Sequence, residues 1–151
     1  REKQKVKRMY GLLEKQFRST YHRAAAMKGR SGENLLMLLE RRLDNVIYRL
    51  GYATSRAEAR QLVKHGHFQI DGKKVQSPSI VVKPGMAISV REKSAEVARI
   101  SGALETLESR SVPQWLEIDP ETRRGVIKEM PNREDITLPI DEQLIVELYS
   151  R

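Results

Sequence analysis

The chain has 151 residues, 39% of them hydrophobic and 32% charged, which is enough for one medium or two small domains with hydrophobic cores. It carries 28 Lys+Arg against 20 Asp+Glu and has no cysteine. This composition excludes disulfides, thiolate zinc sites and cysteine nucleophiles, and it favours a polyanionic partner, nucleic acid first. No apolar stretch approaches the roughly 20 residues of a membrane-spanning helix, and the basic start lacks the apolar core of a secretory signal, so we expect a cytoplasmic protein without membrane contact.

The charge is distributed unevenly along the chain. Residues 1–93 hold 21 Lys+Arg against 8 Asp+Glu, whereas residues 94–151 hold 7 against 12, giving +13 and −5. We expect the basic part to dock on phosphates and the acidic part to face solvent or a basic protein neighbour. Uneven surface charge without a purpose is the weaker alternative.

The first half of the chain has mainly helical patterns. Residues 1–28 predict two basic helices interrupted at Gly11, and residues 29–32 predict a turn. One long core helix is then predicted from Glu33 to Gly51, on the stripe of Leu35, Leu39, Leu43, Val46 and Leu50.

A short helix is predicted next, because Ser55 and Glu58 form a capping box; it should run to Gly66. Alternation then replaces the helical period. Asp71-Gly72 predicts a two-residue hairpin, and Lys83-Pro84-Gly85-Met86 a type II turn between strands at 80–82 and 87–90.

The last third is expected to hold a helix around residues 97–107, short strands around Trp115–Ile118 and Val126–Ile127, and a C-terminal helix. Asp119-Pro120 and Gly125 should separate the strands. Asp141 should cap the C-terminal helix, which should bury Leu144, Ile145 and Leu148.

A cationic helix face is the main candidate binding feature. Arg56, Arg60 and Lys64 stand four residues apart and so share one strip of the short helix, while Ala59, Leu62 and Val63 occupy the neighbouring face. A rigid row of cations suits structured RNA, whose A-form grooves expose phosphates and 2′-hydroxyls. A merely solvated face is equally consistent with these three charges, and the surrounding +13 block favours binding.

Other polar and aromatic candidates are more ambiguous. His65 and His67 fit phosphate or base contacts as well as an ordinary helix end. Phe68 and Trp115 are expected in the core, and Tyr10 and Tyr21 are the better candidates for base stacking. We expect no metal site, because the only other histidine is His22.

We find no sign of an enzyme. The sequence has no phosphate-loop glycine pattern, no HExxH and no cysteine nucleophile. A catalytic site is therefore not expected.

Residues 41–90, RRLDNVIYRLGYATSRAEARQLVKHGHFQIDGKKVQSPSIVVKPGMAISV, resemble the RNA-binding module named after small-subunit ribosomal protein S4. The preceding MYGLLEKQFRSTYHRAAAMKGRSGENLLMLLE and the ending LPIDEQLIVELYSR are also similar to the bacterial S4 family, so the resemblance extends over essentially the whole chain. Similar modules occur in RNA pseudouridine synthases and tyrosyl-tRNA synthetases, which need an additional catalytic domain.

The resemblance implies an α+β fold in two parts. A mostly helical domain at residues 1–40 would be completed by the C-terminal helix at 140–151. An inserted domain at 41–139 would hold the RNA-binding module at about 41–93, with helices packed on a small antiparallel β-sheet. Family members begin with a further segment, in some cases with a four-cysteine zinc site, and this chain starts after it; we expect no cofactor in the residues present.

The resemblance also implies a function. Family members bind a multi-helix junction in the 5′ domain of 16S ribosomal RNA, nucleate assembly of the 30S body, contact ribosomal protein S5 and other 30S proteins, and affect translational accuracy; some bind their own messenger RNA. The implied place is the ribosome in the cytoplasm. The motif and the charges together give as RNA-contact candidates Arg18, Arg23, Lys28, Arg41, Arg42, Arg49, Arg56, Arg60, Gln61, Lys64, His65, His67 and Lys83. Glu142 and Glu147 are candidates for a face towards a protein partner.

Two rival functions remain at this point. One is a fragment of an RNA-modifying enzyme that kept only its binding module, against which the family-like ending argues. The other is a DNA-binding or general polyanion-binding protein, which a preference for folded RNA junctions over duplex DNA would exclude.

Overall fold

The computed structural model describes residues 1–137 and 139–150, and the contacts divide the chain into two compact units. The first unit combines Arg1–Glu40 with Asn132–Arg151, and the second unit is Arg41–Pro131. The fold is α+β, as expected, with the whole β-sheet in the second unit. No helix in the described part of the chain is long and apolar enough to cross a membrane.

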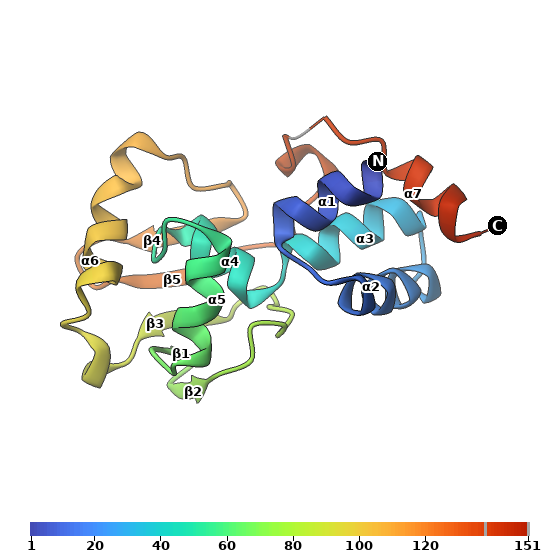
Figure 1. Cartoon of the computed structure of the whole chain (residues 1–151). Coiled ribbons are helices and arrows are strands. Elements are labelled where there is room, and N and C mark those ends of the chain that lie inside the picture. Colours follow the sequence, from blue (N-terminus) through green and yellow to red (C-terminus); the bar gives the residue numbers. More distant parts are fainter. Residues whose placement is uncertain (138, 151) are drawn as a thin grey trace. The chain divides into compact units, whose positions relative to one another are not determined.

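The first unit is helical (Figure 1). Gly11, at φ 69°, ends the first helix, because the left-handed conformation suits glycine at this position. The apolar faces of the helices meet in a small core that includes Val6, Phe17, Leu35 and Leu39. The helices are α1 (Glu2–Tyr10), α2 (Glu14–Ala26), α3 (Ser31–Glu40), the 3-10 turn η3 (Arg133–Asp135) and α7 (Glu142–Tyr149).

The C-terminal helix α7 is attached to the N-terminal helices by stacked rings and close packing. The Tyr149 ring lies 4.4 Å from that of Tyr21 at an interplanar angle of 18°, and Lys3 lies over the Tyr149 ring. A Cβ at Gly32 in α3 would lie 2.8 Å from Cγ of Glu142, so the two helices touch at a point where only glycine fits without movement. The two ends of the chain therefore build one unit.

The chain returns to the first unit at Asn132 and not at residue 140, the boundary we expected. The reason is Arg133, whose guanidinium donates to the backbone oxygens of Ile136 and Ile140 and to Oε2 of Glu142, at 2.8–2.9 Å. Arg133 thus ties Ile136 and Ile140 of the connecting segment to the start of α7.

The second unit packs helices on a five-stranded antiparallel sheet of order β2-β1-β3-β5-β4. Its core contains Leu43, Leu50, Leu62, Phe68 and Trp115, all fully buried, which agrees with the expected core positions of the two aromatic residues. In chain order the elements are α4 (Leu43–Leu50), α5 (Arg56–Lys64), β1 (Phe68–Ile70), β2 (Lys73–Val75), β3 (Ala87–Val90), η1 (Glu92–Ser94), α6 (Ala98–Leu104), η2 (Glu105–Ser109), β4 (Leu116–Asp119) and β5 (Arg124–Ile127).

The two expected turns are confirmed. Asp71 and Gly72 have φ values of 49° and 83°, the pair of positive values that a type I′ hairpin needs, and they join β1 to β2. Gly85 has φ 92°, and the Met86 N–H donates to the oxygen of Lys83, as in a type II turn.

The predicted long helix from Glu33 to Gly51 is wrong, because the chain leaves helical geometry between α3 and α4. Arg42 has φ −62° and ψ 141°, and it forms an isolated antiparallel bridge with Val81. The neighbouring Arg41 exchanges hydrogen bonds with the backbone of Val82. Pairing with a segment some forty residues away thus interrupts a continuous apolar stripe. The segment 80–82 forms this bridge and backbone hydrogen bonds to Arg41 and Leu43, and it is not a strand as we expected.

Two smaller expectations also fail. Leu144 and Leu148 in α7 are 50% and 46% exposed, and only Ile145 of the predicted trio is buried, because α7 is packed on one side. Gly125 lies within β5 and does not separate two strands; a Cβ there would meet Leu50 at 2.7 Å, so glycine lets the sheet approach α4.

Candidate nucleic-acid interface

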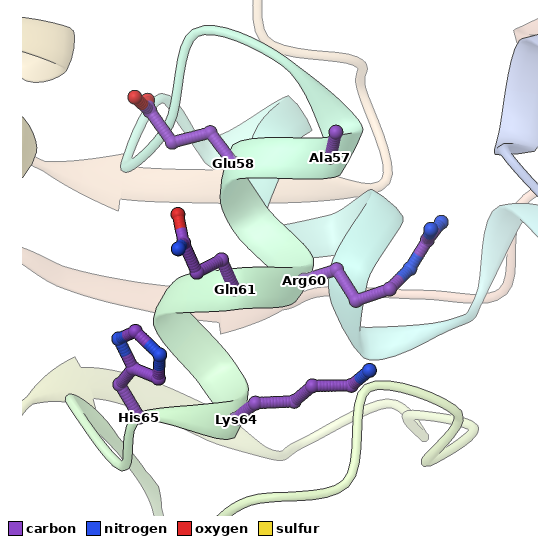
Figure 2. Close-up of a pocket in the computed structure, with 6 residues that line it drawn as sticks. All are labelled: Ala57, Glu58, Arg60, Gln61, Lys64 and His65. Atoms are coloured by element: carbon purple, nitrogen blue, oxygen red, sulfur yellow. The ribbon is translucent and has the colours of Figure 1, made fainter.

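Helix α5 begins at the predicted cap Ser55, but the second bond of the predicted capping box comes from Thr54, one residue before the cap. Ser55 Oγ accepts from the N–H of Glu58, and the Glu58 carboxylate accepts from the N–H of Thr54 at 2.8 Å. Ala59, Leu62 and Val63 are fully buried and anchor one face on the core. Figure 2 shows the other face, an open pocket along the helix lined by Ala57, Glu58, Arg60, Gln61, Lys64 and His65.

Two of the three cations on α5 are held in place by α4. Nε of Arg56 donates to Oδ1 of Asn45 at 2.7 Å, and Nε of Arg60 donates to Oδ2 of Asp44 at 3.2 Å. The Asp44 side chain is 1% exposed and is paired with Arg42 as well. The guanidinium groups on this face are therefore oriented before any partner arrives, which reduces the entropy that binding must overcome.

An arginine and tyrosine stack continues this surface towards the end of α4. The guanidinium carbons of Arg56 and Arg110 lie 4.7 and 5.0 Å from the centre of the Tyr48 ring, and that of Arg49 lies 6.0 Å from it. Arg110 also donates to the backbone oxygens of Tyr48 and Ala53. Sequence reasoning missed Tyr48 and Arg110, because 62 positions separate the two partners.

Arg41 and Arg42 are buried, at 8% and 6% exposure, and their side chains are bonded within the fold. Nε of Arg41 donates to the oxygen of Val82, and Arg42 donates from Nε and Nη2 to the two oxygens of Asp44, at 3.2 Å each. The structure gives these two candidates structural roles, and we leave them out of the proposed RNA surface.

The two histidines at the end of α5 differ in their surroundings. His65 is exposed, whereas Nδ1 of His67 lies 2.8 Å from Oγ of Ser94 and the ring is partly buried. Partial burial lowers the pKa of His67, and the nearby positive charges of His65, Arg99 and Arg91 lower it further. Sequence reasoning placed Arg91 among the basic residues of the module but did not connect it or Arg99 to His67, since no local pattern joins these positions.

The remaining candidates lie on the surface of their own units. Gln61, Lys64 and Lys83 are exposed in the second unit, and Arg49 is half-buried. In the first unit Arg18, Arg23 and Lys28 are exposed on or just after α2. Tyr10 and Tyr21, by contrast, are buried; the Tyr10 hydroxyl donates to Glu40 at 2.7 Å and Tyr21 stacks on Tyr149. These two tyrosines cannot stack on bases.

The two candidate acidic residues of α7 are also not equivalent. Glu142 accepts from Nε of Arg133 at 2.9 Å and packs against Gly32, so it belongs to the packing of the first unit. Glu147 is exposed and lines a pocket with Leu144 and Leu148. Of the two, only Glu147 is exposed, in a pocket lined by charged residues as well as by leucines.

Within residues 1–137 and 139–150, no three side chains of His, Cys, Asp or Glu gather as metal ligands would. What the second unit offers is a set of oriented cations beside exposed polar groups, an arrangement that binds phosphates and 2′-hydroxyls.

Two family models match the chain. The S4 domain matches residues 41–88, and the ribosomal protein S4/S9 N-terminal domain matches residues 1–40. Curated relatives match over the entire length. They include small ribosomal subunit protein uS4A of Myxococcus xanthus, 63% identical, and the uS4 proteins of Trichlorobacter lovleyi and Geotalea daltonii, 65% and 62% identical; each alignment covers 100% of this chain and 73% of the relative. At this identity and coverage the chain belongs to the uS4 family of small-subunit ribosomal proteins.

Proposed function

We propose that this protein binds a multi-helix junction in the 5′ domain of 16S ribosomal RNA and thereby nucleates assembly of the 30S body. Its family consists of structural ribosomal proteins, in agreement with our expectation of a chain without a catalytic site, and the S4 domain is an RNA-binding domain. The observation that carries the proposal is the face of α5, where α4 orients Arg56 and Arg60 and Lys64 is exposed beside them.

The proposed mechanism is recognition of RNA shape through its backbone. Cations from the second unit, together with Arg18, Arg23 and Lys28 of the first unit, contact phosphates of several RNA helices. Phosphate contacts supply the affinity and the shape of the junction supplies the specificity, since bases within A-form duplexes are poorly accessible to side chains.

The test is equilibrium binding of the full chain to the 5′-domain junction RNA, to a scrambled RNA of equal length and to duplex DNA, across a salt series. We expect a strong preference for the junction and a steep salt dependence, because each phosphate neutralised adds about 0.7 to 0.9 to the log–log slope. Equal binding to all three nucleic acids would reduce the function to nonspecific polyanion attachment, and a flat salt response would exclude a phosphate-based mechanism.

A single-charge variant makes the test local. Lys64→Gln removes an exposed cation from the face of α5 and should lower the salt slope by about 0.7 to 0.9. Lys128→Gln removes an exposed cation just after β5, outside the proposed surface, and should leave the slope unchanged. Equal effects of the two variants would count against α5 as the binding face.

We also propose that α7 contacts ribosomal protein S5 and that this contact affects translational accuracy. Exposed Leu144 and Leu148 beside Glu147 give α7 an apolar patch with a charged rim, as protein interfaces have. Glu147→Lys should weaken binding to S5 and change the misreading frequency. If neither quantity changes, α7 is not this contact. Binding to its own messenger RNA is a further proposal, tested by competition between that RNA and the junction RNA.

A further inference from the structure

Several basic side chains gather where α5 ends. Their elements are separate in sequence: His65 and His67 follow α5, Arg91 follows β3, and Arg99 lies in α6. The two histidine rings are 6.2 Å apart. Nη1 of Arg91 donates to the oxygen of Gly66, and Nη1 of Arg99 donates to Oε1 of Gln61, at 3.1 and 3.0 Å. We name these four residues, His65, His67, Arg91 and Arg99, the α5-end cluster.

A fifth basic side chain lies against the cluster. A Cβ at Gly66 would lie 2.8 Å from Cε and 3.4 Å from Nζ of Lys74, so the Lys74 side chain runs past the backbone between the two histidines. Gly66 has φ 77°, a conformation that suits glycine, and the missing side chain leaves room for Lys74 at this point of the backbone.

Among residues 1–137 and 139–150, no ion pair joins a carboxylate to the α5-end cluster. The charged groups that act on the pKa of His67 are His65, Arg99 and Arg91, and all of them lower it. The carboxylates nearest along the chain, Glu92 and Glu96, are exposed, and neither takes part in an ion pair among residues 1–137 and 139–150. Like charges held together by hydrogen bonds to neutral groups repel one another until an anion arrives.

We propose that the α5-end cluster binds one phosphate group of RNA and that this phosphate promotes protonation of His67, so that RNA binds more tightly at mildly acidic pH. The inference rests on the proposed RNA-binding function and adds a site that includes residues beyond 41–88, the range of the S4 domain match. Arg91 and Arg99 supply permanent charge, and His67 supplies the charge that depends on pH.

The chemistry of the ring explains the coupling. A protonated imidazole has two N–H donors, one at each nitrogen. In the cation of His67, Nδ1 donates to Oγ of Ser94, its neighbour at 2.8 Å, and Nε2 is the second donor, for the phosphate. In the free protein, burial and the surrounding cations favour the neutral ring, whereas a phosphate within about 4–6 Å favours the cation. RNA binding should therefore take up a proton near neutral pH.

The experiment measures affinity for the junction RNA at pH 5.5 and pH 8 at constant ionic strength. We expect the wild-type chain to bind about 3- to 10-fold more tightly at pH 5.5, since a rise of one unit in the pKa of one group is worth up to about tenfold. His67→Asn keeps a polar atom near the position of Nδ1 and should lose this extra gain. His22→Asn, at an exposed histidine of α2, should keep it and corrects for titration of the RNA itself.

The arginine is tested separately. Arg99→Gln should lower the log–log salt slope by about 0.7 to 0.9, whereas Arg124→Gln, at the exposed start of β5, should not. Calorimetry at pH 6.5, in two buffers of different ionisation enthalpy, should show proton uptake when the wild-type chain binds the RNA. This measurement does not depend on whether a variant folds.

The outcomes separate this inference from the proposed function. If the junction RNA binds specifically but without proton uptake, or if His67→Asn and Arg99→Gln behave like their controls, the α5-end cluster is not a phosphate site and the proposed function stands. If the wild-type chain shows no preference for the junction, the proposed function itself fails.

Discussion

Replacing Asp44 tests whether α4 holds the cationic face of α5. The Asp44 side chain is 1% exposed, and its carboxylate accepts hydrogen bonds from Nε and Nη2 of Arg42 and from Nε of Arg60. Asp44→Ala leaves the guanidinium of Arg42, whose side chain is 7% exposed, without this counter-charge. Arg60 is 26% exposed, so water replaces much of its lost bond.

The expected loss follows from these exposures. Removing one partner of a buried ion pair costs about 3 to 5 kcal/mol, and the partly exposed Arg60 pair adds less than about 1 kcal/mol. We expect Asp44→Ala to lower the free energy of unfolding of the second unit by about 3 to 5 kcal/mol. Asp44→Asn keeps one acceptor oxygen and should cost less, about 1 to 3 kcal/mol.

The assay is urea unfolding followed by the fluorescence of Trp115, the only tryptophan, which is buried in the core of the second unit. Glu117→Gln, at an exposed carboxylate in β4, is the matched control and should change stability by less than about 0.5 kcal/mol. A loss below about 1 kcal/mol for Asp44→Ala would refute the argument that this carboxylate neutralises a buried arginine.

Three further predictions concern local contacts. Hydrogen bonds from Lys3 and Lys7 lower the pKa of Glu14 to about 2 from 4.5, so the stability that these bonds give is present above pH 4.5 and is lost as pH falls towards 2. Glu14→Gln should reduce this loss of stability at acid pH, measured by far-UV circular dichroism. An unchanged acid unfolding curve would contradict the prediction. Gly125→Ala places a Cβ 2.7 Å from Leu50 and should destabilise the second unit by about 1 to 3 kcal/mol. Gly102→Ala, in an open position of α6, should stabilise the same unit by about 0.5 to 1 kcal/mol. If both variants change the free energy of unfolding in the same direction, measured by Trp115 fluorescence, the packing argument is contradicted. Arg110→Lys loses the fork that donates to Tyr48 and Ala53 and should lower stability by about 1 to 3 kcal/mol in the same assay, while no loss would mean that water replaces those bonds.

Local patterns determined much of this protein from the sequence alone. The capping residue Ser55 starts α5, Asp71-Gly72 forms the hairpin, and the apolar spacing in α5 places Leu62 and Val63 in the core. Each of these features depends on residues a few positions apart, so the backbone geometry that they require can be read without knowledge of distant partners. The cationic row on α5 is a feature of the same kind.

The tertiary structure decided which charges are available for binding. Arg41 and Arg42 are charged in the sequence like Lys64, yet pairing with residues 81–82 and with Asp44 buries them. The same pairing breaks the apolar stripe that predicted one long helix. Contacts between residues tens of positions apart leave no period in the sequence, because they depend on how elements pack and not on the conformation of each one.

Packing also brought together side chains that no sequence motif connects. Arg91 and Arg99 meet His67 only because β3 and α6 bring them to the end of α5, and Arg110 meets Tyr48 across 62 positions. Leu144 and Leu148 have the spacing of a core face, but α7 is covered on one side and leaves them exposed. The sequence by itself thus determined most of the elements, the hairpin turns and the sign of the charge. The tertiary structure decided where the long helix breaks, which side chains are buried and which converge, since these are properties of packed elements.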